Sequence, residues 1–429
     1  MKELYIINSK EEFNSKQTLV WNQKCIKENN ILDVFCLIDQ NKFSIRNKYL
    51  YWIYQIQILK VNKKSIVEHL KIDGNFSFWW MLPIAEKSNF IKSFPANEIL
   101  KIIALESYLK RNKFKRIITC GLNKSTNIII AQIATENKIS FFKKKEKFFF
   151  SFNFAIINFL KSFLWLIFYL FKRRNLFGVN LSEWKLTKNK LCIVSYLFNI
   201  DLNLLKKQKF SSTYWNHLIK NIHSKHKGIN WLNIFFENDE IKNSSDAKLI
   251  LDQLNKTNPR DLHITLDTFL SFEVLFISLK TWLNIFFKSF ILTKKKIIRI
   301  EKKKYFLILG DEFVNNLQNH HLLKNILTYF LMKKAFSEIC KQNTCIFVHE
   351  NQQWEMAFIN NFHRYKHNNL IGYQHTTTRF WDLRNFYHSD VYRKDSKAYS
   401  YPMPTKLAVH SKLFFKIWIK SKYPKKNIK

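Results

Sequence analysis

Short apolar runs alternate with longer helical stretches along most of the chain, and this alternation predicts an α/β fold. The apolar runs expected to form strands are Leu4–Ile7, Val34–Ile38, Arg116–Cys120, Leu191–Tyr196, Ile229–Phe235, Tyr305–Leu309, Cys345–Val348, Asn369–Gly372 and Lys406–Val409. The stretches expected to form helices are residues 98–111, 124–137, 211–225, 244–256, 313–341, 351–365 and 411–421. We see no internal sequence repeat.

One long segment, Phe148–Phe171, departs from this pattern because it is apolar throughout, with Lys161 as its only formal charge. A bilayer span needs about 20 residues, so the segment is long enough to cross a membrane. Both flanks are basic, which gives no orientation under the positive-inside rule. Soluble-looking α/β sequence on both sides argues against a single span, because the two halves would then lie in different compartments.

A second segment, Thr268–Leu292, combines an apolar majority with a narrow polar stripe. Its polar positions, at spacings of seven, four and four, are Glu273, Lys280, Asn284 and Lys288. That spacing places them on one face of a helix. We expect both segments to be helices that dock on the cytoplasmic face of the cell membrane. Burial in the protein core and a true span are the alternatives.

The formal charge of +39 invites a nucleic-acid interpretation. However, lysine far outnumbers arginine, asparagine, isoleucine and phenylalanine are abundant, and glycine totals only 6. This joint bias is typical of an A/T-rich coding sequence, so part of the basicity is mutational background. The basic residues are also spread along the chain. Contact with an anionic membrane surface or a phosphate-bearing substrate is therefore favoured over nucleic-acid binding.

The six cysteines form no C-x-x-C pair, which fits buried, reduced thiols in a cytosolic protein. The tandem His320 and His321 face different directions on a helix, and His363 and His367 lack the glutamate of a zinc-protease motif. We therefore expect no metal site. The first residues, Met1 to Asn8, fit a short strand better than a signal peptide.

Polar side chains gather where two apolar runs end, within residues 346–384. The run Cys345–Val348 is followed by His349, Glu350, Asn351, Gln352, Gln353, Trp354 and Glu355. The run Leu370–Ile371 is followed by Gln374, His375, Thr376, Thr377, Thr378, Arg379 and Asp382. Ligands of open α/β sheets bind where strands end and loops begin. These two strand ends are therefore the candidate site.

Glu350 is the candidate general base, because a carboxylate fixed at a strand end can deprotonate a hydroxyl group. Glu355 lies about one and a half helical turns further on and is expected to face elsewhere, either stabilising the helix dipole or acting in function. His375 is a phosphate ligand, an acid/base group or a loop-ordering residue. Arg379 and Arg384 suit a phosphate or carboxylate. Trp354 and Trp381 suit stacking on a sugar or base, or core packing.

Two further clusters lie upstream. After Asp73-Gly74, the adjacent Trp79 and Trp80 form either a sugar-binding wall or a hydrophobic staple between domains. Gly121, Lys124 and Ser125 lie where a strand passes into a helix, and a helix N-terminus can bind a phosphate. The P-loop spacing is absent there, and a plain strand–turn–helix junction is the alternative.

Three stretches together resemble a bacterial family of surface-carbohydrate (O-antigen) biosynthesis proteins. They are Asp73 to Ser88, His349 to Glu355, and Gly372 to Thr378 with Trp381-Asp382. That family is similar to glycosyltransferases of the two-Rossmann, GT-B type, which act in lipopolysaccharide and capsule polysaccharide assembly. The resemblance implies a hexosyl or nonulosonic (Kdo-type) acid transferase without a cofactor. Its substrates would be a nucleotide-activated sugar and a lipid-linked or oligosaccharide acceptor.

Under this resemblance Glu350 and His375 would be catalytic. The residues that would bind substrate are Asp73, Trp79, Trp80, Asn351, Gln353, Trp354, Glu355, Gln374, Thr376, Thr378, Arg379 and Asp382. The alternative function is a non-catalytic assembly factor that binds a glycan or lipid carrier. Nucleic-acid binding comes third.

The expected domain plan is a Rossmann-like GT-B type N-terminal domain, an incomplete second Rossmann-like domain, and membrane-associating helical insertions. Residues 1–147 form the N-terminal part, residues 148–174 the apolar helix, and residues 175–300 an α/β continuation. Residues 301–429 form the second domain, which is expected to be incomplete because few residues follow Lys406–Val409. A partner would then supply the missing donor-binding half.

Overall fold

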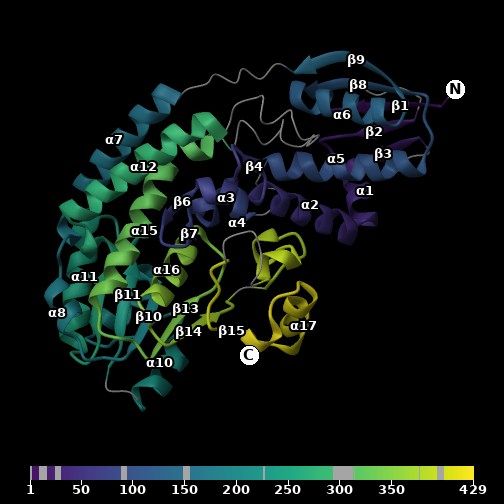
Figure 1. Cartoon of the computed structure of the whole chain (residues 1–429). Helices are drawn as coiled ribbons and strands as arrows, with labels where there is room; N and C mark the ends of the chain where they lie inside the picture. The colour runs from purple at the N-terminus through teal and green to yellow at the C-terminus, as the bar shows by residue number, and fades with distance from the viewer. Residues whose placement is uncertain are drawn as a thin grey trace.

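The computed structural model describes residues 2–8, 17–24, 30–87, 94–147, 155–225, 228–292, 313, 315–375, 377–393 and 401–429. The fold is α/β, with two parallel sheets and helices packed around them, as the alternation of apolar runs predicts (Figure 1). The expected strand Tyr305–Leu309, residues 148–154 of the apolar segment, Ser88 and Thr376 lie outside the described residues.

The first sheet is built from the amino-terminal part of the chain and has the strand order β3-β2-β1-β8-β9, all parallel. Its strands are β1 (Glu3–Ile7), β2 (Thr18–Val20), β3 (Ile31–Asp33), β8 (Arg116–Asn123) and β9 (Ser140–Lys147). Its helices are α1 (Val34–Gln40), α2 (Lys42–Gln57), α5 (Phe94–Arg111) and α6 (Lys124–Glu136).

The second sheet has six parallel strands in the order β12-β11-β10-β13-β14-β15. Its strands are β10 (Leu191–Tyr196), β11 (Asn230–Ile234), β12 (Leu262–Thr265), β13 (Thr344–Val348), β14 (Asn369–Tyr373) and β15 (Lys406–Ala408). Along the chain this is the doubly wound order 3-2-1-4-5-6. The order reverses between β10 and β13, and such a reversal opens a crevice at the carboxyl ends of the strands.

The domain boundary that we expected at residue 301 falls within this sheet. Three of its strands, β10 to β12, come from the region assigned to a continuation of the first domain, and three come from residues 344–408. Hydrophobic periodicity identifies strands but carries no information about which strands pair, so the boundary at residue 301 divided one sheet into two.

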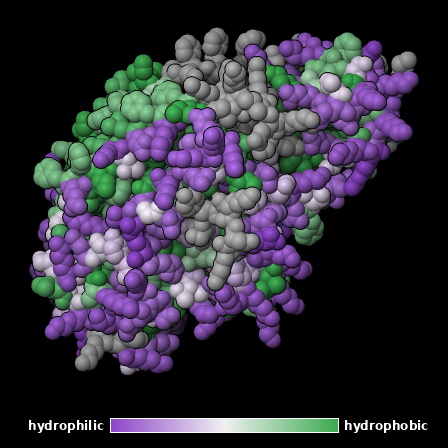
Figure 2. Space-filling view, in the orientation of Figure 1, coloured by the Kyte–Doolittle hydropathy of each residue, from purple (hydrophilic) through white to green (hydrophobic). Residues whose placement is uncertain are grey.

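The helices around the second sheet are α7 (Ala155–Arg173), α8 (Leu181–Leu186), α9 (Leu202–Lys206), α10 (Asn216–His223), α11 (Ser244–Thr257), α12 (Phe272–Leu292), α15 (His320–Glu338), α16 (Gln353–Arg364) and α17 (Lys412–Lys420). α15 packs against α16, α12 and α7. α7 and α12 form the outermost layer on one side (Figure 1), and Figure 2 shows apolar residues gathered over that side.

A segment of small elements joins the two sheets. It comprises β4 (Lys60–Val61), β5 (Lys64–Ser65), α3 (Ile66–His69), β6 (Lys71–Asp73), β7 (Phe76–Ser77), a 3₁₀ turn (Phe78–Met81) and α4 (Pro83–Glu86). Phe76 stacks on Tyr329 of α15 at a centroid distance of 4.8 Å. The Asn325 amide of α15 donates to the Met81 carbonyl at 3.0 Å. One hydrophobic core therefore continues from the first sheet, through this segment, into the second.

The strand expected at Val34–Ile38 is the helix α1 instead. Asp33 caps this helix, because its side chain accepts a hydrogen bond from the Cys36 backbone N–H at 2.8 Å. An apolar run of five residues fits a buried strand or a buried helix equally well, and only the capping residue distinguishes them.

Candidate functional site

The chain turns sharply after β13, and Glu355 holds this turn. Asn351 has a φ of +58°, in the left-handed region, which folds the loop back over the start of α16. The Glu355 carboxylate accepts hydrogen bonds from the backbone N–H groups of Glu350, at 3.1 Å, and Asn351, at 3.0 Å. The expectation that Glu355 faces away from Glu350 was wrong, because a regular helix does not begin until Gln353.

Glu355 is fully buried and has a structural contact on each oxygen. Burial raises the pKa of its carboxyl group well above the usual value, although the backbone N–H donors act in the opposite direction. The side chain therefore shapes the loop that presents Glu350.

Four polar side chains link β10 to the loop after β13. The Tyr196 hydroxyl, at the end of β10, donates to the Gln352 carbonyl oxygen at 3.1 Å. The Trp354 indole N–H lies 3.1 Å from both of these oxygens. The Gln352 amide in turn donates to Glu350 Oε2 at 2.5 Å. This network lies at the reversal of strand order, where the sheet topology opens a ligand crevice.

A cavity of 330 Å³ opens beside this network. Its lining includes Tyr196, Tyr214, Phe236, Glu350, Gln352 and His375. His375, which follows β14, is exposed, and its ring meets the Tyr214 ring edge-on at 4.3 Å. The structure therefore brings the two predicted catalytic side chains to one cavity, although they are 25 positions apart in the chain.

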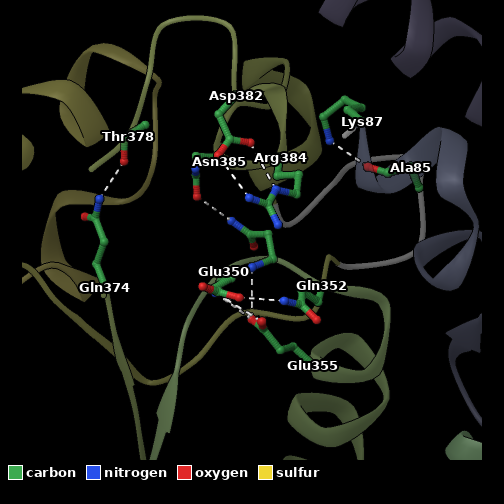
Figure 3. Close-up of polar contacts among 11 residues, drawn as sticks. Ala85, Lys87, Glu350, Gln352, Glu355, Gln374, Thr378, Asp382, Arg384 and Asn385 are labelled. Atoms are coloured by element: carbon green, nitrogen blue, oxygen red, sulfur yellow. Dashed lines mark hydrogen bonds and ion pairs between the residues drawn. The ribbon is translucent and has the colours of Figure 1, made fainter. Parts of the chain in front are cut away.

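Several other polar side chains that follow β14 form hydrogen bonds or ion pairs within the protein. Gln374 is buried; its carbonyl oxygen accepts from the Trp418 indole at 2.7 Å, and its amide donates to Thr378. Asp382 forms a two-point ion pair with Arg384, at 3.0 and 3.1 Å. Figure 3 shows Gln374 and Thr378 facing each other, apart from the group formed by Glu350, Gln352 and Glu355. Arg379 is exposed.

Asn351 also has a structural role. Its amide donates to Asn385 Oδ1 at 3.2 Å, and its own carbonyl oxygen accepts from the Tyr401 hydroxyl. Gln353 accepts a hydrogen bond from the Asn325 amide of α15. These contacts attach the loop after β13 to the segment 383–401 and to α15. The side chains left facing a cavity are therefore Glu350, Gln352, Gln353 and Trp354.

The adjacent tryptophans do not form an open wall. Trp79 and Trp80 are 0% and 2% exposed, because the 3₁₀ turn that carries them is packed beneath the junction of the two sheets. Trp80 meets the Tyr401 ring edge-on at 5.2 Å. Their role is that of the hydrophobic staple, and the sugar-wall interpretation was wrong.

Asp73 is held by two ion pairs, with Lys333 at 2.7 Å and Arg364 at 2.9 Å. Arg364 ends α16, whereas Glu350 precedes its start. At 1.5 Å per residue, these two ends are about 17 Å apart. Asp73 therefore stands apart from the cavity beside Glu350 and connects β6 to α15 and α16.

Gly121, Lys124 and Ser125 belong to the first sheet. Gly121 lies within β8 with a φ of +72°, where the pairing with β9 shifts register. Asn123 caps α6 by accepting from the Thr126 N–H at 2.7 Å. Figure 1 shows β8 and α6 at the other end of the molecule from β13 and β14. The structure thus does not bring this group to the candidate site.

Two residues near the site were missed from the sequence. Tyr196 ends a predicted strand. Its link to Gln352 becomes visible only once β10 is seen to pair with β13. Lys87 is buried; its ammonium donates to the Ala85 carbonyl at 2.7 Å and lies 3.2 Å from the centre of the Tyr387 ring. Burial lowers its pKa well below the usual value. Lys87 lies within the stretch Asp73 to Ser88 that carries the family resemblance, but its sequence context does not show that it is buried, since lysine is so common in this chain.

No group of three or more His, Cys, Asp or Glu residues poised to hold a metal ion occurs in the part of the chain that the structure describes. No family model, curated protein or solved structure matches this chain.

Proposed function

We propose that the protein is a glycosyltransferase of the two-Rossmann, GT-B type, acting in surface polysaccharide assembly. The observation that carries this proposal is the position of Glu350. It lies at the carboxyl edge of a six-stranded, doubly wound sheet, at the reversal of strand order, and faces a cavity also lined by His375. Nucleotides commonly bind at this point of such sheets. The sequence resemblance to carbohydrate biosynthesis proteins supports the same assignment.

The proposed reaction is the transfer of a sugar from a nucleotide-activated donor to a hydroxyl group. Glu350 takes the proton from the acceptor hydroxyl, whose oxygen forms a bond to the anomeric carbon. The bond between that carbon and the donor phosphate breaks, and the nucleotide leaves as an anion. Gln352 positions the Glu350 carboxylate through its hydrogen bond. His375 is exposed beside Tyr214, where it can contact the donor phosphate.

Replacement of Glu350 tests the catalytic assignment. In a host whose own copy is deleted, Glu350→Gln should leave the protein folded but abolish the surface glycan seen on gels, because the amide cannot accept the proton. The matched control is Glu240→Gln at an exposed position, which should restore the glycan. Normal glycan in the Glu350→Gln strain would exclude this base and favour the alternative, a non-catalytic protein that binds a glycan or lipid carrier.

We also infer that the enzyme docks on the inner face of the cell membrane through α7 and α12. These two helices are long and apolar enough to cross a membrane by length and composition. On α7 the exposed apolar side chains are Ile156, Ile157, Leu160, Phe163, Leu164, Ile167, Phe168 and Phe171. On α12 they are Phe272, Phe276, Phe287, Phe290 and Ile291. Single exposed apolar residues are ordinary, but a continuous patch of this kind marks an interaction surface.

An anionic lipid surface fits this apolar face, because exposed basic residues accompany it. Lys161, Lys172 and Arg174 are exposed on α7 and just beyond its end, and Lys280 is exposed on α12. The other side of α7 is attached to the protein, since Phe159 stacks on Trp282 of α12 at 5.0 Å. A helix attached along one side and apolar along the other suits docking in the interface better than crossing the bilayer.

A further inference from the structure

A second cavity, of 380 Å³, adjoins the one beside Glu350. It lies between α4, α7, α15 and the carboxyl ends of β11 and β12. Both parts of the molecule contribute to it, since Glu86 comes from the segment that joins the sheets. Gln352 and Phe236 line both cavities and therefore form the partition between them. The volume is within the range of small-molecule sites, which is about 300–1,000 Å³.

The walls of this second cavity combine aromatic rings with hydrogen-bonding groups. Trp165 and Trp354 provide flat apolar surfaces. Glu86 and Asp267 provide carboxyl groups, Lys324 and Arg173 provide cations, and Asn325, Thr328 and Gln353 provide neutral donors and acceptors. The two acids offset the two bases, so a strongly anionic ligand is not favoured. A purely apolar ligand would leave these polar groups without water or partners, which is costly.

A sugar fits this combination. One face of a pyranose ring is made of C–H groups that pack on an aromatic ring, whereas its hydroxyls each donate and accept hydrogen bonds in the plane of the ring. The carboxylates of Glu86 and Asp267 accept hydrogen bonds, the cations of Lys324 and Arg173 donate them, and the side chains of Asn325, Thr328 and Gln353 can do both. The cavity therefore offers both kinds of partner to each hydroxyl group.

We propose that the second cavity binds the sugar unit of a lipid-linked acceptor. This proposal rests on the proposed glycosyltransferase function and adds the position of the acceptor. Gln352 on the partition donates its amide to Glu350, so the Gln352 side chain lies between a sugar in the second cavity and the proposed base.

The helix α7 explains why the acceptor would be carried by a lipid. Trp165, Tyr169 and Arg173 are spaced four residues apart, lie on one face of α7 and line the second cavity. Leu164 and Phe168, on another face of the same helix, are exposed apolar residues of the docking surface. One helix thus forms both the wall of the sugar cavity and part of the surface proposed to meet the membrane.

Saturation-transfer NMR on the full chain tests this proposal. The probes are the methyl glycosides of glucose, galactose, mannose and N-acetylglucosamine, at millimolar concentration. We expect saturation transfer to at least one of them. Thr328→Trp, which fills the cavity, and Trp165→Ala, which removes an aromatic wall, should each reduce that signal at least about tenfold. The control Thr135→Trp lies on an exposed position of α6 and should leave the signal unchanged.

The outcomes separate this proposal from the proposed function. Saturation transfer to none of the four glycosides, or transfer that Thr328→Trp leaves unchanged in a protein with wild-type circular dichroism, overturns the acceptor site. Neither result depends on catalysis by Glu350. Conversely, normal glycan assembly by Glu350→Gln would remove the catalytic role of that residue and leave the glycoside signal intact.

Discussion

His349 is a buried residue at the base of the loop that carries Glu350. It is fully buried, and its ring nitrogens have no hydrogen-bond partner among the described residues. Its ring packs edge-on against Phe347, at 5.7 Å, and Trp418, at 6.0 Å. Burial lowers the pKa of this histidine to about 4, so the ring is neutral in the folded protein at physiological pH. His349 thus supports the loop that carries Glu350 and takes no part in proton transfer.

This buried histidine should make the stability of the protein depend on pH. The unfolded histidine has a pKa of about 6.5, so on acidification the unfolded state takes up a proton first. Stability is therefore lost as pH falls from about 6.5 to about 4. Between pH 7.5 and 5.0 the loss from His349 should be about 2 kcal/mol. Urea unfolding at the two pH values measures this loss in the wild-type protein and in His349→Leu. The loss of unfolding free energy should be smaller in the variant by about 2 kcal/mol, and an equal loss in both proteins would contradict this role of His349.

Gly372 is required by the ring of His349. A Cβ atom at position 372 would lie 3.0 to 3.2 Å from three His349 side-chain atoms, which is too close for an ordinary contact. We expect Gly372→Ala to destabilise the protein by about 1–3 kcal/mol, the usual cost of overpacking. In a His349→Ala background the same change should cost less, because the ring is gone. Urea unfolding of the four proteins measures this coupling; additive effects would show that the ring is not the obstacle.

At the residue level, the sequence predicts which polar side chains gather at strand ends but not which of them the fold uses. Glu355 and Gln374 look as suitable for chemistry as Glu350 and His375. Glu355 and Gln374 differ from the other two because the fold supplies them with hydrogen-bond donors. The backbone N–H groups of the turn after β13 donate to Glu355, and the Trp418 indole of α17 donates to Gln374. Those contacts depend on the tertiary structure, so no local pattern shows them.

At the scale of single elements, α7 has a length and a composition that the sequence predicts well. Its apolar run predicts a long helix, and the docking of this helix on a membrane is our proposal. The sequence does not show that Ser162 and Leu166 are buried against the protein while Leu164 and Phe168 face outward. That division makes docking testable by substitutions confined to the outer face.

Vesicle flotation should show this docking. We expect the wild-type protein to float with vesicles containing one quarter phosphatidylglycerol in phosphatidylcholine. Leu164→Glu combined with Phe168→Glu should abolish most of the binding, because charges on this face oppose insertion. The control pair, Leu249→Glu with Leu413→Glu, changes equally exposed leucines elsewhere. Equal flotation of both double variants, or wild-type protein that never floats, would refute the docking surface.

The hairpin of β6 and β7 is the element that ties the first part of the chain to α15 and α16. In this hairpin Asp73 forms ion pairs with Lys333 and Arg364, which are partly exposed and therefore screened by salt. We expect Asp73→Asn to lower the free energy of unfolding by about 1 kcal/mol at low salt, and by less in 1 M salt. Urea unfolding at two salt concentrations checks this; no change at either would mean that the ion pairs add nothing to stability.

At the scale of the whole molecule, the strands of the second sheet are easy to predict and their arrangement is not. Leu191–Tyr196 and Cys345–Val348 are buried on both faces, so they stand out as apolar runs. Their pairing brings Tyr196 beside Gln352 across more than 150 residues. The crevice at the reversal of strand order follows from that pairing and could not be predicted from either run alone.

We propose that the cavity between the ends of β10 and β13 binds the nucleotide of an activated sugar. Calorimetric titration of the full chain with UDP, GDP, dTDP and CMP measures this binding. We predict that at least one nucleotide binds, that Asn199→Trp, which fills the cavity, weakens binding at least about tenfold, and that Asn368→Trp at an exposed position leaves it unchanged. Binding of none of the four, or binding that Asn199→Trp does not alter, would contradict the claim.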